Sequence, residues 1–317
     1  MRYTRYKMEY KVQYNSIAKS RIESIGPVKS RTNVEIPNDI TEIKKCNFME
    51  CYYLKTVILP NNIKIIGHSA FNRCYDLENV KLSSNIEIIR SKAFWGCRSL
   101  EKINIPNSIK AIEHAAFSGC ESLKKINISN SIKYINDEIF CNCTSLKEIS
   151  LPDSIIGINA NAFCNCHKLE KIYFSNNLEN IQCGTFYNCQ SLKEIKLPNS
   201  LKYIGESAFE KCNSLEKINI PSSVGIIGSL AFSECDKLEK IAIKSKCRIR
   251  NDIFKSCSNL KKIYITQESY DLSPDFVYEY KDKITIIKPK TLDELLDEGK
   301  SIREASQIIS QHDDFMI

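Results

Sequence analysis

Histidine and glycine are scarce in this chain, which has four histidines and ten glycines among 317 residues. Nucleophilic catalysis usually needs a base such as histidine beside the nucleophile, and a phosphate-binding loop needs clustered glycines. We therefore expect no enzyme active site, no cofactor and no small-molecule substrate. Apolar runs are also short. None approaches the roughly 20 residues of a membrane-spanning helix, and the start of the chain leads into no apolar stretch, so we expect no secretory signal and a cytoplasmic protein.

What the chain has instead is a period of 23 residues. A phenylalanine, a cysteine three residues later and a leucine three residues after that recur from Phe48 onward, and the last of ten visible units follows a one-residue deletion. Self-similarity at this length predicts a solenoid in which each unit stacks on the next. The phenylalanine column contains Phe48, Phe71, Phe94, Phe117, Phe140, Phe163, Phe186, Phe209, Phe232 and Phe254.

Each unit continues as Leu-x-x-Ile-x-Ile, which alternates as a short strand does. Proline often follows, as at Pro60 and Pro106, and it ends the strand because it cannot donate a backbone hydrogen bond. An Ile-x-x-Ile pair and a small residue then lead to the next phenylalanine, which predicts turns or short helical segments. One unit buries too little apolar surface to offset its loss of backbone entropy. We therefore predict a stacked array with a parallel sheet along one face.

The pattern Pro-x-x-Leu-x-x-Ile-Gly-x-x-Ala-Phe-x-x-Cys-x-x-Leu-x-x-Ile-x-Ile at residues 198–220 resembles the leucine-rich repeat of the BspA-like family. The resemblance covers residues 33–266. The segment at 267–290 is similar to the terminal cap that often closes such arrays. The resemblance implies a curved solenoid used for binding, commonly in adhesion or surface recognition, and it implies no catalytic residues. Because bacterial relatives are generally exported, it also gives the cell surface as an alternative location.

The flanks of the array predict separate segments. Residues 1–32 combine an alternating, strand-like pattern with one Ile-x-x-Ile-Gly motif, so we expect an N-terminal cap with a degenerate repeat. Residues 291–317 contain two capping-box motifs and predict a short α-helical appendage. This tail serves either as a further cap or as a partner-binding or self-associating element. The sequence does not indicate an oligomeric state.

Fifteen cysteines are present, and ten of them belong to the repeat. We expect these ten to be reduced structural thiols, because stacked neighbours have parallel Cβ vectors that suit a disulfide poorly. Cys141 and Cys164 each stand two residues before a repeat cysteine in consecutive units. They leave two alternatives, a disulfide between them under oxidation or a metal site. The Cys-x-Cys spacing departs from the usual Cys-x-x-Cys of zinc sites, which makes the metal site the weaker alternative.

The residues that flank the central isoleucine of each strand should face away from the core, because side chains alternate along a strand. They form two stripes across the predicted sheet and are our candidates for partner binding. Lysine dominates, which suits a protein partner with an acidic surface. The lysine stripe comprises Lys102, Lys125, Glu148, Lys171, Glu194, Lys217, Lys240 and Lys262, and the second stripe comprises Asn104, Asn127, Tyr173, Lys196, Asn219 and Tyr264.

The sequence thus predicts a non-catalytic protein–protein interaction scaffold. One alternative is a surface or secreted BspA-like adhesin, which the family resemblance suggests. The other is a polyanion- or nucleic-acid-binding protein that uses the lysine stripe. Nucleic-acid surfaces usually interleave more aromatic or arginine side chains with their lysines, and the net charge of +7 is modest, so this last alternative is the weakest of the three.

Overall fold

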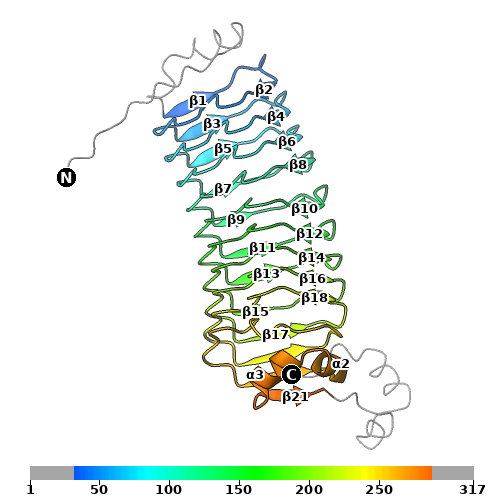
Figure 1. Ribbon diagram of the computed structural model, residues 1–317. Helices are drawn as coiled ribbons and strands as arrows, with labels where there is room; N and C mark the ends of the chain where they lie inside the picture. The colour runs from blue at the N-terminus through cyan, green and yellow to red at the C-terminus, as the bar shows by residue number, and fades with distance from the viewer. Residues whose placement is uncertain (1–31, 288–317) are drawn as a thin grey trace, which may run out of the picture.

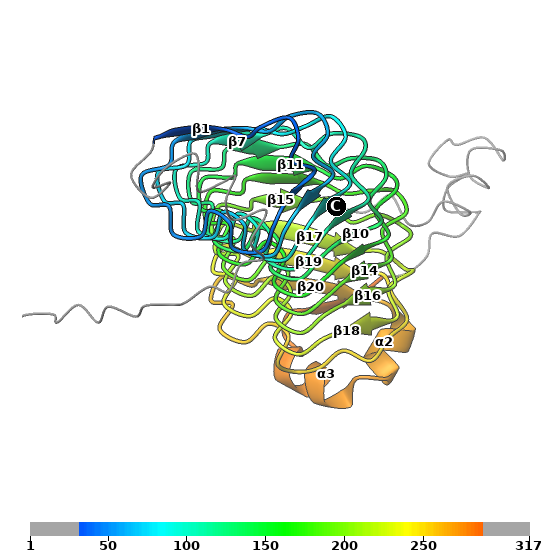
Figure 2. The ribbon, with the colours of Figure 1, turned by 90° about the horizontal axis from the view of Figure 1, so that it is seen from above.

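The computed structural model describes residues 32–287, which coil into a solenoid of about 11 turns (Figure 1). This confirms the predicted fold class. Viewed from above, successive turns are offset in one direction along the array (Figure 2). Residues 1–31 and 288–317, which include nearly all of the predicted N-terminal cap and the whole predicted helical tail, lie outside the described residues.

The predicted Leu-x-x-Ile-x-Ile strands form one row of parallel strands along the solenoid. The row is continuous from β1 to β9, has a separate pair at β11 and β13, and is continuous again from β15 to the end. Its strands are β1 (Asn33–Glu35), β3 (Thr56–Ile58), β5 (Asn79–Lys81), β7 (Lys102–Ile103), β9 (Lys125–Ile126), β11 (Glu148–Ser150), β13 (Lys171–Tyr173), β15 (Glu194–Ile195), β17 (Lys217–Ile220), β19 (Lys240–Ile243) and β20 (Lys262–Ile265).

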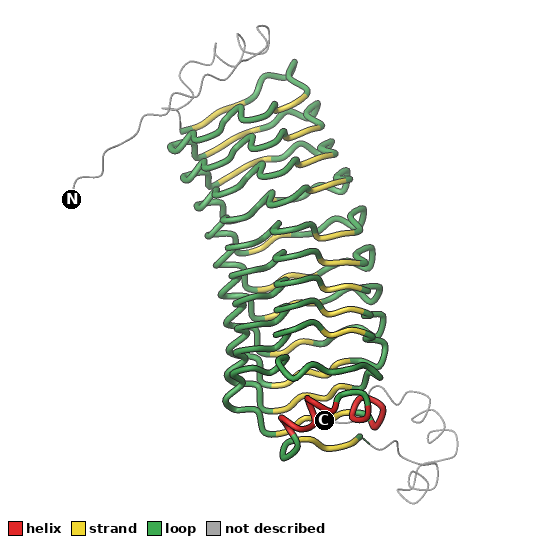
Figure 3. Tube along the Cα trace, viewed as in Figure 1, coloured by secondary structure: helices red, strands yellow, loops and turns green. Residues whose placement is uncertain are grey.

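A second row of two-residue strands, which the sequence did not predict, occupies the Ile-x-x-Ile segments after the turn (Figure 3). These strands also pair in parallel with the turns before and after them. They are β2 (Glu42–Ile43), β4 (Ile65–Ile66), β6 (Ile88–Ile89), β8 (Ala111–Ile112), β10 (Tyr134–Ile135), β12 (Gly157–Ile158), β14 (Asn180–Ile181), β16 (Tyr203–Ile204) and β18 (Ile226–Ile227).

The phenylalanine and cysteine columns are buried in the core together with the inward isoleucines and leucines of the repeats. All ten phenylalanines are at most 2% exposed, and their rings stack from turn to turn up to Phe232, after which Phe254 is tilted by 31°. Each repeat thiol from Cys74 to Cys257 donates a hydrogen bond to the carbonyl of the phenylalanine one turn earlier, over 2.9 to 3.4 Å. The cysteines therefore do more than fill space, because their thiols satisfy backbone acceptors between turns.

The spacing of the turns follows the small residue before each phenylalanine. Seven of the nine phenylalanine steps have ring centroids 5.0 to 5.4 Å apart. The two wider steps, of 6.0 Å, end at Phe140 and Phe254. At these two steps the preceding residue is Ile139 or Ile253, whereas most other turns have alanine. The larger side chain holds the turns apart, and both strand rows are interrupted at the Ile139 step, between β9 and β11 and between β8 and β10.

Most turns also contain two residues with left-handed backbone, two positions before and two positions after the phenylalanine. Examples are Lys92 (φ 57°) and Asn142 (φ 60°). Sixteen non-glycine residues and three glycines adopt such positive φ angles in residues 32–287. Non-glycine residues rarely take this conformation because Cβ approaches the following carbonyl oxygen. The inter-turn hydrogen bonds, such as Lys92 N to His114 O at 3.0 Å, hold the backbone in place.

The C-terminal end of the described array is closed by α2 (Gln267–Asp271), α3 (Pro274–Tyr280) and β21 (Ile284–Ile286). Phe276 of α3 is fully buried and continues the phenylalanine column, with its ring 6.1 Å from that of Phe254. β21 adds a last strand to the first row by pairing with β20. These elements cover the open end of the stack, within the segment for which the sequence predicted a cap.

Candidate protein-interaction face

The lysine stripe lies in register across the first strand row. Lys217 is opposite Lys240, and Lys240 is opposite Lys262. Toward the other end, Lys102 is opposite Lys125. All eight residues of the stripe are exposed. The stripe contains six lysines and two glutamates, so it has a net charge of +4, and the strands present that charge on one face.

The second stripe is less uniform. Asn104, Asn127, Lys196 and Asn219 are exposed, and Tyr173 is 53% exposed. Tyr264 is half-buried, and Ala242, which lies between Asn219 and Tyr264 in the strand register, is buried. The described structure therefore brings the candidate residues to one face but interrupts the second stripe at its C-terminal end.

The residue directly before each position of the lysine stripe is also charged, and together these residues form a row that is neutral overall. Several of its members pair along the solenoid. Lys124 Nζ is 2.9 Å from Glu101 Oε1, and Lys261 Nζ is 2.8 Å from Glu239 Oε1. The hydrogen bond from Lys261 lowers the pKa of Glu239. This paired row comprises Lys55, Glu78, Glu101, Lys124, Lys147, Glu170, Lys193, Glu216, Glu239 and Lys261. Because its five lysines and five glutamates balance, the row adds no net charge to that of the stripe.

The stripe continues into the C-terminal segment at Lys283, which sequence reasoning missed. Ile263 pairs with Ile284, so the half-buried Lys283, which directly precedes β21, continues the register of Lys262 and extends the run to four lysines. The sequence does contain a pattern that could have predicted this position, because Lys283-Ile-Thr-Ile repeats Lys262-Ile-Tyr-Ile. Within residues 32–287, none of the lysines at 217, 240, 262 and 283 forms an ion pair. At a rung spacing of about 4.8 Å, neighbouring ammonium groups repel each other by up to about 1 kcal/mol in water.

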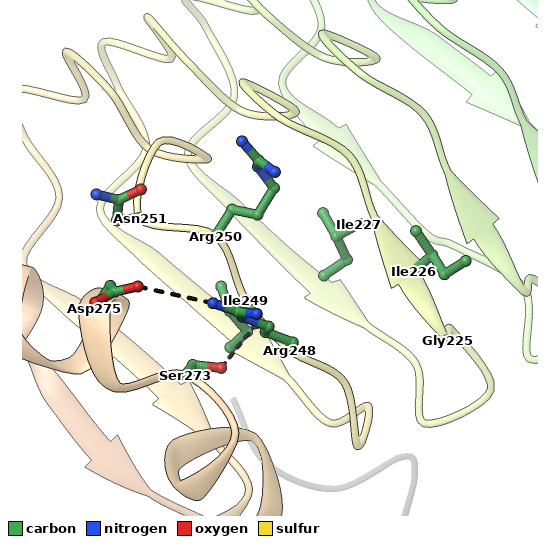
Figure 4. A pocket seen from close by; sticks show the side chains of 9 residues that line it. All are labelled: Gly225, Ile226, Ile227, Arg248, Ile249, Arg250, Asn251, Ser273 and Asp275. Carbon is green, nitrogen blue, oxygen red and sulfur yellow. Dashed lines mark hydrogen bonds and ion pairs between the residues drawn. The ribbon is translucent and has the colours of Figure 1, made fainter.

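A groove of about 450 Å³ lies at the end of the second strand row, between β18 and the start of α3 (Figure 4). Two arginines line it, but each has an acidic partner. Arg248 is 3.8 Å from Asp275, and Arg250 is 3.3 Å from Asp252. The Ile249 amide donates to Ser273 Oγ at 2.8 Å. The groove therefore has little free charge to offer an ionic ligand.

Titratable groups that could support catalysis are dispersed. Burial lowers the pKa of His68, and the nearby Lys45 and Lys92 lower it further. The hydrogen-bond partner of His167 Nε2 is the side-chain amide of Asn188, whose Nδ2 lies 3.2 Å away, and not a carboxylate. Among residues 32–287, no three or more His, Cys, Asp or Glu side chains gather as metal ligands. In the same part of the chain, no helix has the length and apolar character to cross a membrane.

Comparison with known proteins identifies the repeat. The BspA type leucine rich repeat region, in six copies, matches overlapping spans at residues 27–147, 64–191, 110–235 and 179–296. The chain belongs to the BspA-type leucine-rich repeat family. Proteins of the BspA-type family generally act in protein interaction or adhesion, and they are generally not enzymes. Among curated proteins, none matches the chain.

Several solved structures resemble this BspA-type chain. A leucine-rich repeat protein from Bacteroides ovatus is 27% identical over 81% of this chain and 84% of its own, with a TM-score of 0.46. A leucine rich cell surface protein from Faecalibacterium prausnitzii is 22% identical over 76% of this chain and 90% of its own, with a TM-score of 0.43. The pneumococcal vaccine antigen PcpA is 20% identical over 81% of this chain and 79% of its own, with a TM-score of 0.52, and shares the fold.

Proposed function

We propose that this chain is a non-catalytic scaffold that binds a protein with an acidic surface on the exposed face of the first strand row. The run of four lysines at positions 217, 240, 262 and 283 is the centre of the binding face. The observation that carries this proposal is the stacking of four like charges on consecutive rungs without an ion-pair partner among the described residues. A carboxylate that reaches two neighbouring lysines relieves their mutual repulsion as well as adding its own attraction.

A protein partner suits this face better than a nucleic acid does. The lysine stripe contains no arginine and no aromatic residue, and Tyr173 and Tyr264 are the only aromatic members of the second stripe. Stacking on aromatic side chains supplies much of the affinity of proteins for single-stranded nucleic acids. Two isolated tyrosines, one of them half-buried, offer few such stacking positions. Charge is then the main recognition feature, with asparagine amides beside it to bond a peptide or a side chain.

The proposal is tested with the purified full chain and two polyanionic probes, a poly-glutamate peptide and a double-stranded oligonucleotide. The variant changes Lys217, Lys240 and Lys262 to glutamine. A matched control changes Lys64, Lys110 and Lys202 to glutamine, which removes the same charge from the start of second-row strands. Fluorescence anisotropy at low and moderate salt measures the affinities.

We expect the stripe variant to bind poly-glutamate at least about tenfold more weakly, which corresponds to a loss of about 1.4 kcal/mol, and the control to bind nearly as the unmodified chain does. Equal losses in both variants would contradict a specific face, because net charge alone would then explain binding. Tighter binding of the oligonucleotide than of poly-glutamate, lost in the stripe variant and falling steeply with salt, would support the polyanion alternative instead.

The location of the protein decides which acidic partners it meets, and adhesion is a family role that the same face could serve. Protease treatment of intact cells distinguishes a cytoplasmic location from the cell surface. A cytoplasmic scaffold stays intact under this treatment, whereas a surface adhesin is cleaved while a cytosolic marker survives.

A further inference from the structure

Two cysteines outside the repeat column lie side by side in the middle of the solenoid. Cys141 and Cys164 each follow the phenylalanine of their turn and occupy equivalent positions on consecutive turns. Both side chains are partly exposed. The backbone between them is fixed, because the Asn142 amide donates to the Cys164 carbonyl at 2.7 Å. Adjacent parallel rungs are about 4.8 Å apart, inside the Cα separation that a disulfide accepts.

An asparagine ladder beside these two cysteines keeps the turns in register. Asn165 Nδ2 donates to Asn142 Oδ1 at 2.9 Å, and Asn188 Nδ2 donates to Asn165 Oδ1 at 2.8 Å. Asn142 Nδ2 also donates to Cys141 Sγ at 3.2 Å. We call Cys141 and Cys164 the thiol pair. Backbone and asparagine hydrogen bonds between their turns hold its two members next to each other.

The other cysteines of this region differ from the thiol pair in access or in partner. Cys143 and Cys166, in the same two turns, are fully buried and donate to phenylalanine carbonyls. Cys183 is exposed, but the equivalent positions in the adjacent turns are alanine and glutamate. The thiol pair is therefore both reachable from solvent and supplied with a neighbouring thiol.

The pKa values of the two thiols shift in opposite directions. The neighbouring Cys141 lowers the pKa of Cys164, while the neighbouring Cys164 and burial raise the pKa of Cys141. Glu138 is the acidic group near both thiols, and it opposes deprotonation of either one. The thiolate is the nucleophilic form of cysteine, so the lower pKa favours Cys164 as the attacking sulfur, and the position of Cys141 on the adjacent turn makes it the resolving thiol.

We propose that the thiol pair is a redox site that exchanges with low-molecular-weight disulfides and closes into a disulfide between two consecutive turns. The Cys164 thiolate attacks one sulfur of the small disulfide, and the thiolate that leaves takes up the proton released by Cys164. Cys141 then loses its proton and attacks Cys164 Sγ, and the second small thiolate leaves with that proton. Two protein thiols have given up two electrons, and one small disulfide has become two thiols.

The bridge is suited to reversible formation. The side chains of equivalent positions on stacked turns point in parallel directions, so the disulfide forms only with adjustment of both residues, and strained disulfides are more easily reduced. The pair also lies next to the wide step between Phe117 and Phe140, where both strand rows are interrupted. Closing the bridge fastens the turn of Phe140 to the turn of Phe163.

The test exposes the folded full chain to glutathione disulfide, blocks the remaining thiols by alkylation and maps the peptides by fragment mass spectrometry. We expect a Cys141–Cys164 bridge without retained glutathione, a glutathione adduct on Cys183, and free Cys143 and Cys166. In Cys141→Ser the resolving thiol is missing, so glutathione should stay on Cys164. Treatment with a mild thiol reductant should restore both thiols of the unmodified chain.

Retention of glutathione on Cys164 in the unmodified chain would overturn the proposal, as would two free thiols in the pair after Cys183 has reacted. A bridge from Cys141 to Cys143 would also overturn it, since that bond does not join two turns. The unmodified chain gives each of these results by itself, so the proposal remains testable if the serine variant fails to fold.

Discussion

Replacing Gly228 by alanine should destabilise the array, because the backbone of the preceding turn leaves no room for a Cβ at this position. Gly228 directly follows β18, and its amide donates to the Ile204 carbonyl at 2.8 Å. A Cβ at this position would lie 2.3 Å from Glu206 N and 2.5 Å from Gly205 C. Both atoms belong to the backbone of the preceding turn, so no side chain can rotate to make room. Gly225 is the matched control, because a Cβ there meets nothing closer than Lys202 O at 3.9 Å.

The size of the effect follows from what other turns tolerate. The position equivalent to Gly228 is Arg90 in one turn and Glu113 in the next, so the backbone of this fold can adjust to accept a side chain here. The cost is that of overpacking, about 1–3 kcal/mol. Gly225→Ala restricts the unfolded chain without a clash and should stabilise by about 0.4–1 kcal/mol. The two alanine variants should thus differ by about 1.5–4 kcal/mol in the free energy of unfolding.

Urea unfolding of the full chain, followed by far-ultraviolet circular dichroism, measures this difference. Gly228→Ala should lower the midpoint and Gly225→Ala should leave it unchanged or raise it, with similar slopes where the array unfolds cooperatively. A broadened transition in Gly228→Ala alone would indicate that the C-terminal turns have uncoupled from the rest. Equal midpoints for the two variants would refute the reasoning that close backbone approach requires glycine at position 228.

Two further substitutions test the turn geometry. Ile139→Ala should lower the free energy of unfolding by no more than about 2 kcal/mol, the low end of the usual range for this change, because alanine at position 139 lets the wide step close. Ile158→Ala on β12 should lower it by about 3–5 kcal/mol. Urea midpoints compare the two variants, and equal losses of stability would contradict the spacing argument. Lys92→Gly removes the strain of a left-handed residue at a cost in chain entropy, so it should stabilise the protein by between zero and about 1 kcal/mol. The same change at the strand residue Lys102 should destabilise it by about 0.5–1 kcal/mol. A melting temperature lowered equally by both changes would contradict the assignment of strain to the left-handed position.

The sequence predicts the array because the same physical demand recurs in every unit. A residue such as Phe94 must be buried between two copies of itself, so its identity repeats at the period of the turn and can be read by counting. The inward isoleucines and leucines follow the same logic. The sequence also places the lysine stripe, since alternation along a strand decides which residues face outward.

The features that the sequence did not predict are those that depend on contact between turns. Left-handed positions hold residues as different as Lys92, Asn142 and Leu230, so no residue type marks them. The second strand row arises because adjacent Ile-x-x-Ile segments come within hydrogen-bonding distance once the phenylalanines stack. The wide step at Ile139 had a signal, a bulky residue in a column of alanines, but its effect on spacing emerges only from the stacked structure.

The strand lengths in the first row connect the fold to the proposed binding face. β17, β19 and β20, which carry Lys217, Lys240 and Lys262, each have four residues, whereas the other first-row strands before them have two or three. Their longer ladders offset the repulsion between stacked ammonium groups, which would otherwise disfavour this register. The lysine run is therefore held by the best-formed part of the sheet. A partner that binds there finds the charges already aligned, so less of the binding free energy is spent on ordering them. If the run served only solubility, the same lysines would function equally well on the shorter strands or in the turns, where no pairing energy opposes their repulsion.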